Sequence, residues 1–215
     1  MAHINPHGTP LPRLFLISGG QENPDNSSLL LKQLELLPRS LSCMVQIREK
    51  HLEAKQLFSL AQKAADMVLP TGTRLLINER ADIALAAGLH GVHLPESGCP
   101  PDKIRAVAPD LLIGCSVHSS SSAIIAEHSG ADYLLFGPVF DTPSKRKYGA
   151  PQGLDKLGKL CRSTTLPVFA VGGITPQNVS HCMREGAYGA AGISIFKPGE
   201  EFAGNFEQFY RVLYQ

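Results

Sequence analysis

The residues best suited to chemistry lie in a polar loop that follows the apolar run 133–136. This loop reaches residue 153 and carries Thr142 and Lys145 three positions apart, with Arg146 and Lys147 directly after them. Hydroxyl and cationic donors grouped in this way suit an anionic ligand. A solvated surface loop with a basic tip is the alternative interpretation, and the rest of the chain must decide between the two.

Other short apolar runs also end in polar residues. The polar residues at or after the ends of these runs are Gln46, Arg48, Lys50, Asn78, Glu79, His93, Glu96, Ser116, His118, Thr142 and Lys145. Two later runs end in Gly172–Gly173 and in Gly192-Ile193-Ser194. Glycine N–H groups after such strands commonly bind phosphate, although glycines that serve only close packing would leave the same pattern.

The elements that position these residues alternate along the whole chain. Apolar runs of strand length are expected at 14–18, 42–47, 74–78, 91–94, 112–116, 133–136, 168–171 and 189–193. Helical spacing is expected between them, after the possible caps Asn26 and Ser27, at 52–68, 81–87, 154–160 and 176–185, from Pro101, after the serine run 119–122 and in the last segment. Gly88, Gly130 and Gly186 follow three of the expected helices, where a left-handed residue commonly ends a helix.

Eight strand–helix units without a linker predict one α/β domain over residues 1–215, a single (β/α)8 TIM barrel, with 1–12 as a loose tail. Sites on this fold lie at the C-terminal ends of the strands. The polar residues listed above occupy those ends, so we expect them to converge at one mouth of the barrel.

Composition excludes several classes of function. The 20 Lys and Arg against 19 Asp and Glu give a net charge of +1, without the basic excess of a nucleic-acid or anionic-membrane surface. No segment reaches the length of a membrane span, and the start of the chain lacks a secretory pattern. Five scattered cysteines without C-x-x-C spacing indicate reduced thiols in a cytoplasmic protein. The sequence does not decide between a monomer and a homodimer.

Seven short motifs in order resemble the thiamine phosphate synthase and thiazole tautomerase family from about residue 14 to 196. They are Gln46-x-Arg48-x-Lys50, Ile77-Asn78, Gly91-Val92-His93-Leu94, Gly114-x-Ser116-x-His118, Gly137-Pro138-x-Phe140-x-Thr142-x-x-Lys145, Val171-Gly172-Gly173-Ile174 and Ile193-Ser194. The resemblance implies a (β/α)8 barrel and a small-molecule phosphate substrate. It also implies that Gly173 and Ser194 bind a thiazole phosphate. Six residues would line the side of a pyrimidine pyrophosphate, namely Arg48, Lys50, Asn78, Ser116, Thr142 and Lys145.

Two departures from the synthase pattern concern its metal. In the synthase pattern two aspartates bind magnesium. Glu79 stands at the position of the first one here, and Gly98 stands at the position of the second. Because magnesium requires short distances in near-octahedral geometry, these changes predict a weakened site. Glu96, two residues before Gly98, is the other carboxylate that could replace the lost ligand. We therefore expect a metal-independent thiazole tautomerase without a cofactor, an isomerase. The alternative is a synthase, a transferase, with magnesium bound through Glu79; the motif at 46–50 favours that branch.

A tautomerase needs proton transfer near neutral pH, which histidine performs well. His118, in the loop after the fifth strand, is the candidate for catalysis, and a structural histidine is the alternative interpretation. His93 is assigned to packing. A third hypothesis is a barrel that binds thiazole or thiamine phosphates without catalysis.

Overall fold

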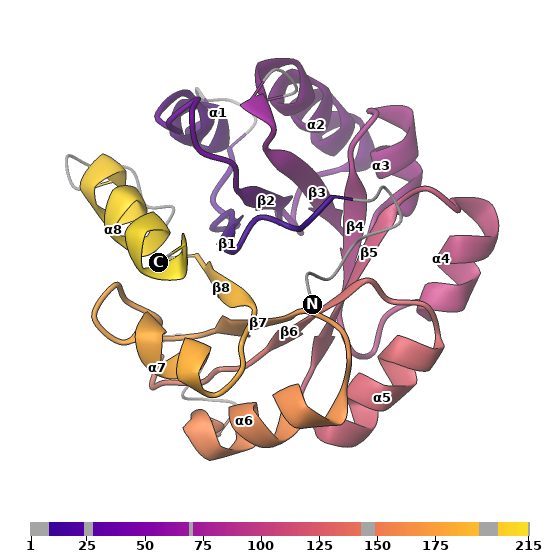
Figure 1. The fold of residues 1–215 in the computed structure, drawn as a ribbon. Coiled ribbons are helices and arrows are strands. Elements are labelled where there is room, and N and C mark those ends of the chain that lie inside the picture. Colours follow the sequence, from indigo (N-terminus) through magenta and orange to yellow (C-terminus); the bar gives the residue numbers. More distant parts are fainter. Residues whose placement is uncertain (1–8, 24–27, 69–70, 143–148, 194–201, 215) are drawn as a thin grey trace.

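The computed structural model describes residues 9–23, 28–68, 71–142, 149–193 and 202–214. Within these residues, eight parallel strands form a closed barrel in which β8 pairs with β1 (Figure 1). The strands are β1 (Leu14–Ile17), β2 (Met44–Ile47), β3 (Arg74–Asn78), β4 (Gly91–Leu94), β5 (Leu112–Val117), β6 (Tyr133–Phe136), β7 (Val168–Val171) and β8 (Gly189–Gly192). The predicted (β/α)8 barrel is confirmed.

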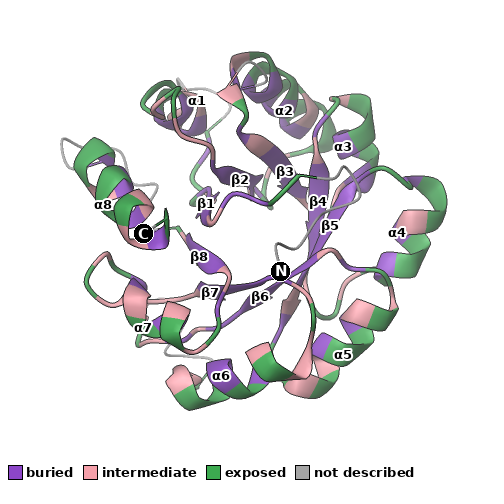
Figure 2. Ribbon diagram, viewed as in Figure 1, coloured by how far each residue is buried: buried purple, intermediate pink, exposed green. Residues whose placement is uncertain are grey.

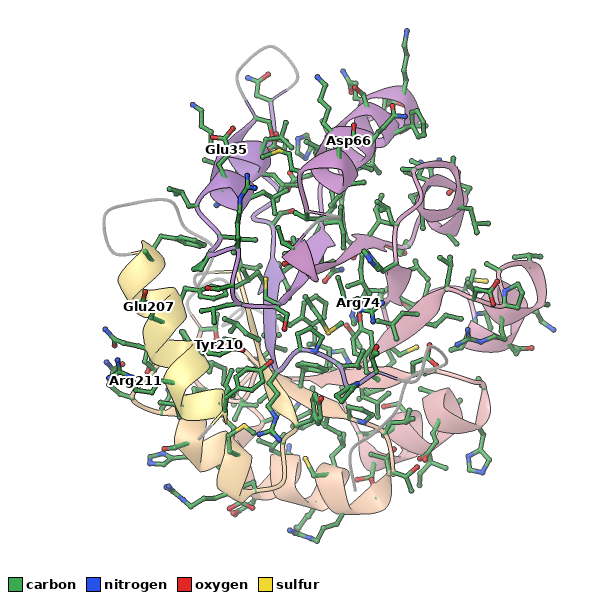
Figure 3. All side chains as sticks on the ribbon, turned by 45° about the horizontal axis from the view of Figure 1, so that its top comes forward. Glu35, Asp66, Arg74, Glu207, Tyr210 and Arg211 are labelled. Atoms are coloured by element: carbon green, nitrogen blue, oxygen red, sulfur yellow. The ribbon has the colours of Figure 1, made fainter. Side chains whose placement is uncertain are left out.

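A helix follows each strand and packs against the outside of the barrel (Figure 1). The helices are α1 (Leu29–Glu35), α2 (Ala54–Val68), α3 (Ala81–Ala86), α4 (Pro101–Val107), α5 (Ser120–His128), α6 (Gly153–Ser163), α7 (Val179–Arg184) and α8 (Phe202–Tyr214). Their barrel-facing sides are buried and their outer sides exposed (Figure 2). On α8, Phe206 and Phe209 are buried, whereas Arg211 is exposed and projects away from the barrel (Figure 3).

The ends of the helices follow the signals in the sequence. Pro101 begins α4, and Ser119 caps α5 through reciprocal bonds with Ser122. Gly88, Gly130 and Gly186 have φ of +64°, +90° and +97°, a left-handed conformation that glycine adopts without a steric cost. The predicted glycine stops are therefore confirmed.

The N-terminal end of the barrel is closed by apolar side chains. Phe15, Tyr133 and Phe169 are fully buried inside the barrel and meet edge to face, with ring centroids 5.6–5.7 Å apart. Leu11 joins this cluster with 3% of its surface exposed, and its carbonyl accepts a 2.5 Å bond from the Tyr188 hydroxyl. The expected loose tail is thus fastened at its last residues, while 1–8 lie outside the described part of the chain.

Several element boundaries differ from those expected. Helix α7 begins at Val179 rather than at residue 176, because a turn precedes it in which Asn178 Oδ1 accepts a bond from the backbone N–H of Thr175. The cap of α1 is Ser28, which accepts the N–H of Leu31 and follows the expected caps Asn26 and Ser27, which lie outside the described residues. All five cysteines are free. In the described part of the chain, no helix has the length and apolarity needed to cross a membrane.

Candidate functional site

Polar side chains gather at the C-terminal ends of β2, β3 and β4, as expected. Gln46 and His93 are buried, with 1% and 3% of their surfaces exposed, and both belong to strands that line the barrel. In the register of the sheet, Asn78 pairs with His93 and Ile17 with Gln46. We call Gln46, Asn78, His93 and Ser116, together with Arg48, Lys50 and Glu79 in the loops that follow β2 and β3, the polar mouth.

One hydrogen-bonded series crosses the mouth from β2 to the end of β3. Gln46 Nε2 donates to Asn78 Oδ1 at 3.1 Å, and Asn78 Nδ2 donates to Glu79 Oε2 at 2.7 Å. The same carboxylate oxygen lies 3.3 Å from Lys50 Nζ. Glu79 adopts φ +62°, which is uncommon for a residue other than glycine. The series joins four of the residues selected from the sequence.

A second series extends from the inside of the barrel to the mouth. His93 Nδ1 lies 3.1 Å from the Tyr133 hydroxyl, and His93 Nε2 lies 2.9 Å from Ser116 Oγ. Burial, together with the positive charge of Arg48, lowers the pKa of His93 to about 3. The imidazole is therefore neutral near pH 7. The packing role expected for His93 is confirmed by its stacking on Tyr133, but its bond to Ser116 was not anticipated.

A buried carboxylate that the sequence did not single out fastens the loop after β1 to the loop after β2. Glu49, 3% exposed, accepts bonds from the Ser18 hydroxyl at 2.5 Å, the Gly20 N–H at 3.1 Å and the Glu22 N–H at 3.0 Å. Ser18 Oγ in turn accepts the N–H of Arg48 at 2.8 Å. Glu49 thus fixes the backbone that carries Arg48 and Lys50. The position of Glu49 between Arg48 and Lys50 is the sequence feature that could have identified it.

The loops after β6 and β7 pack closely. Gly172 and Gly173 have φ of +95° and +65°, and a Cβ at Gly172 would lie 2.5 Å from Pro138 Cβ and 3.2 Å from Thr142 Oγ1. A Cβ at Gly173 would lie 2.7 Å from the carbonyl of Asp141. Packing alone therefore accounts for both glycines, and phosphate binding there stays a prediction. Ile193 follows β8 with 38% of its surface exposed. Lys145 and Ser194 lie outside the described residues.

His118 lies at the mouth but pairs with a carboxylate of the neighbouring loop. Its Nδ1 is 2.6 Å from Glu96 Oε2, and its backbone N–H donates to Glu96 Oε1 at 3.3 Å. Burial raises the pKa of Glu96, but hydrogen bonds from Ser122 and His118 outweigh that effect, so the pKa lies below its usual value. The sequence named both residues without indicating that they pair.

Among the described residues, no group of three or more His, Cys, Asp or Glu is arranged to hold a metal ion. Magnesium is nevertheless often bound through one or two carboxylates together with substrate phosphates. Glu79 supplies a hard oxygen donor of that kind, with 42% of its side chain exposed. Among the described residues, the donor set therefore fits a magnesium ion that is bound together with phosphate oxygens of a ligand.

The family model described as "Thiamine monophosphate synthase" matches residues 14–196. The chain belongs to this family. A protein of Aquifex aeolicus is 41% identical over 186 residues, which cover 86% of this chain and 98% of that protein. The "Thiamine-phosphate synthase" of Chloroflexus aurantiacus is 38% identical over 151 residues, 70% of each chain.

A solved structure supports the same family membership. The thiamine phosphate pyrophosphorylase from Pyrococcus furiosus superposes with a TM-score of 0.79 at 27% identity, over 94% of this chain and 95% of that one. Membership of the thiamine monophosphate synthase family, expected from the seven motifs, is therefore confirmed. The family model and the Chloroflexus aurantiacus relative both carry the synthase name, so they support the synthase alternative rather than the tautomerase that the sequence favoured.

Proposed function

We propose that the protein is a thiamine-phosphate synthase, which joins a thiazole phosphate to hydroxymethylpyrimidine pyrophosphate. In this reaction a bond forms between the thiazole ring nitrogen and the methylene carbon of the pyrimidine. The bond from that carbon to the pyrophosphate oxygen breaks, and pyrophosphate leaves with the electron pair. The leaving group gains negative charge, so the site must supply positive charge and hydrogen-bond donors where it departs.

The observation that carries this proposal is the mixed cationic and amide composition of the polar mouth. Arg48 and Lys50 provide fixed positive charge, and donors come from Asn78 on β3 and from Ser116 on β5, on either side of β4. Donors held in place before reaction cost no reorganisation when charge develops. Thr142 lies beside Gly172, and Lys145 belongs to the same loop in sequence. We assign these residues to the pyrophosphate, and Gly173 and Ser194 to the thiazole phosphate.

The proposal includes a magnesium ion, which Glu79 would hold. When bound with the pyrophosphate, a magnesium ion would neutralise part of the charge of the leaving group. The chain itself contributes the Glu79 carboxylate, which Asn78 and Lys50 orient. Glu96 is committed to His118 and is not assigned to the metal.

A coupling assay with both substrates and magnesium tests the proposal. We expect thiamine phosphate to form, and we expect Glu79→Gln to raise the magnesium concentration needed for half-maximal rate. Asp82→Asn is the matched control, because Asp82 is an exposed carboxylate on α3 that pairs with Arg80. An absence of product from the parent protein with both substrates and magnesium present would refute the synthase assignment.

A tautomerase remains the second candidate, supported by the pairing of His118 with Glu96. A carboxylate on Nδ1 holds the imidazole in one orientation and leaves Nε2 for proton transfer, the arrangement of a general base. Both residues are partly exposed, with 53% and 39% of their side-chain surfaces accessible. A substrate could therefore reach the pair at the mouth.

His118→Asn separates the two candidates. A tautomerase should lose about 10²- to 10⁴-fold in turnover of the thiazole tautomer when its general base is removed. Coupling by a synthase should change far less, since His118 is not assigned to the pyrophosphate. Binding of thiazole phosphate without either turnover would instead indicate the non-catalytic binding protein.

A further inference from the structure

The aromatic side chain of Tyr133 carries a hydroxyl that packing does not require. Its ring is fully buried between Phe15 and Phe169, and it lies over Gly114, where a Cβ would be only 1.9 Å from Tyr133 Cζ. A phenylalanine would fill the same space. The hydroxyl contacts Nδ1 of His93 at 3.1 Å, and among the described residues that nitrogen is its hydrogen-bond partner.

The protonation of the His93 ring follows from this contact. A neutral imidazole carries one proton, on either Nδ1 or Nε2. If Nδ1 carried it, the buried phenol proton would have no acceptor among the described residues, a cost that native structures avoid. If Tyr133 donates to Nδ1, every group is satisfied and Nε2 carries the proton.

The tautomer decides what Ser116 can do. With the proton on Nε2, His93 donates to Ser116 Oγ across 2.9 Å. The Ser116 hydroxyl then keeps its own proton for a group beyond the barrel. In the other tautomer the hydroxyl would have to donate to Nε2 and would face a ligand only as an acceptor. A pyrophosphate oxygen requires a donor.

We propose that Tyr133 and His93 are positioning residues that fix the Ser116 hydroxyl as a hydrogen-bond donor to the pyrophosphate group. This inference rests on the synthase function proposed above. It also gives a role to the buried hydroxyl of Tyr133, whose ring otherwise only packs in the core. The cation of Arg48 acts on the same imidazole, so an anion at this point meets both the charge and the hydroxyl.

The tautomer is measured first, by ¹⁵N NMR of the His93 ring, which distinguishes a protonated nitrogen from an unprotonated one. We expect protonated Nε2 and unprotonated Nδ1 in the parent protein, and a mixture of tautomers or the opposite one in Tyr133→Phe. Tyr188→Phe is the matched control, because it removes a hydroxyl from the same apolar cluster that donates to the Leu11 carbonyl. A proton on Nδ1 in the parent would overturn the proposal.

The kinetic consequence is measured next. Loss of one hydrogen bond should lower kcat/KM for the pyrimidine pyrophosphate about tenfold in Tyr133→Phe, with the KM for thiazole phosphate unchanged. His93→Gln, whose amide N–H can replace Nε2–H, should retain more activity than His93→Leu. In a Ser116→Ala background, Tyr133→Phe should have no further effect.

An equal loss in that background would show that Tyr133 acts by another route, and it would overturn the proposal. If the parent protein lacks coupling activity, the synthase assignment fails separately. The affinity for inorganic pyrophosphate, measured by calorimetry, then replaces kcat/KM as the readout. A Tyr133→Phe affinity equal to that of the parent, or no binding by the parent, would overturn the proposal in that case.

Discussion

The two ends of the barrel are built from the same strands but have opposite chemistry. At the N-terminal end, Phe15, Phe169 and Leu11 fill the interior and exclude water. At the C-terminal end, the successive inward positions become Gln46, Asn78, His93 and Ser116, which bond in two pairs, Gln46 with Asn78 and His93 with Ser116. One end therefore supplies most of the packing and the other supplies the donors and charges, so that substitutions at the two ends should affect different measurements.

The largest expected effect is the loss of stability that follows when a side chain of the apolar end is removed. Phe15→Ala removes a side chain with none of its surface exposed and should lower the free energy of unfolding by about 3–5 kcal/mol. Urea denaturation measures this loss. Leu36→Ala, at a residue 48% exposed, is the control and should cost less than about 0.5 kcal/mol. Comparable losses in the two variants would contradict the assignment of stability to the apolar end.

The next effect is on catalysis and comes from the polar mouth. Lys50→Ala removes a partly exposed cation and should lower kcat by about 10²- to 10³-fold, the effect of losing one group that stabilises developing charge. Because the ion pair of Lys50 with Glu79 is exposed, the free energy of unfolding should change by no more than about 1 kcal/mol. Lys63→Ala on the exposed face of α2 should leave both quantities unchanged. A folded Lys50→Ala with full activity would remove Lys50 from the site.

A smaller effect concerns pH, at the point where the two ends meet. The pKa of His93 is about 3 in the folded protein against 6.5 ordinarily, so the unfolded chain binds more protons between these values. The contribution of His93 to stability is therefore complete above pH 6.5 and is lost as the pH falls toward 3. Between pH 7 and pH 5 this loss should be about 2 kcal/mol.

Urea denaturation of the parent and of His93→Gln at both pH values isolates this contribution. The variant has no imidazole to titrate at this position. From pH 7 to pH 5 its free energy of unfolding should therefore fall by about 2 kcal/mol less than that of the parent protein. Equal pH dependence in the two proteins would mean that the imidazole is not held neutral.

The sequence predicted the strands better than the contacts between their side chains. The bounds of β3, β4, β6 and β7 match those expected, because glycine, proline or polar residues interrupt the apolar pattern at each end. The expected start of α7 was wrong, since Pro176 belongs to the turn that precedes the helix. Local patterns determine where elements end, and therefore they can be read from the chain.

The pairings within the site depend instead on register and side-chain direction. Ser116 meets His93, His118 meets Glu96, and Glu49 meets Ser18, over separations of 22 to 31 residues. No local pattern encodes these distances. The sequence therefore identified most residues of the mouth, but the roles of Glu49, Tyr133 and His93 required the closed barrel.

The claim on which the functional account depends is that the polar mouth binds pyrophosphate. Isothermal titration with inorganic pyrophosphate, with and without magnesium, tests it most directly in the parent protein and in Arg48→Met. We expect one pyrophosphate per chain, tighter binding when magnesium is present, and a large loss of affinity in the variant, which lacks the guanidinium whose charge acts on His93. Equal affinity in the parent and in Arg48→Met, or no binding to the parent, would contradict the account.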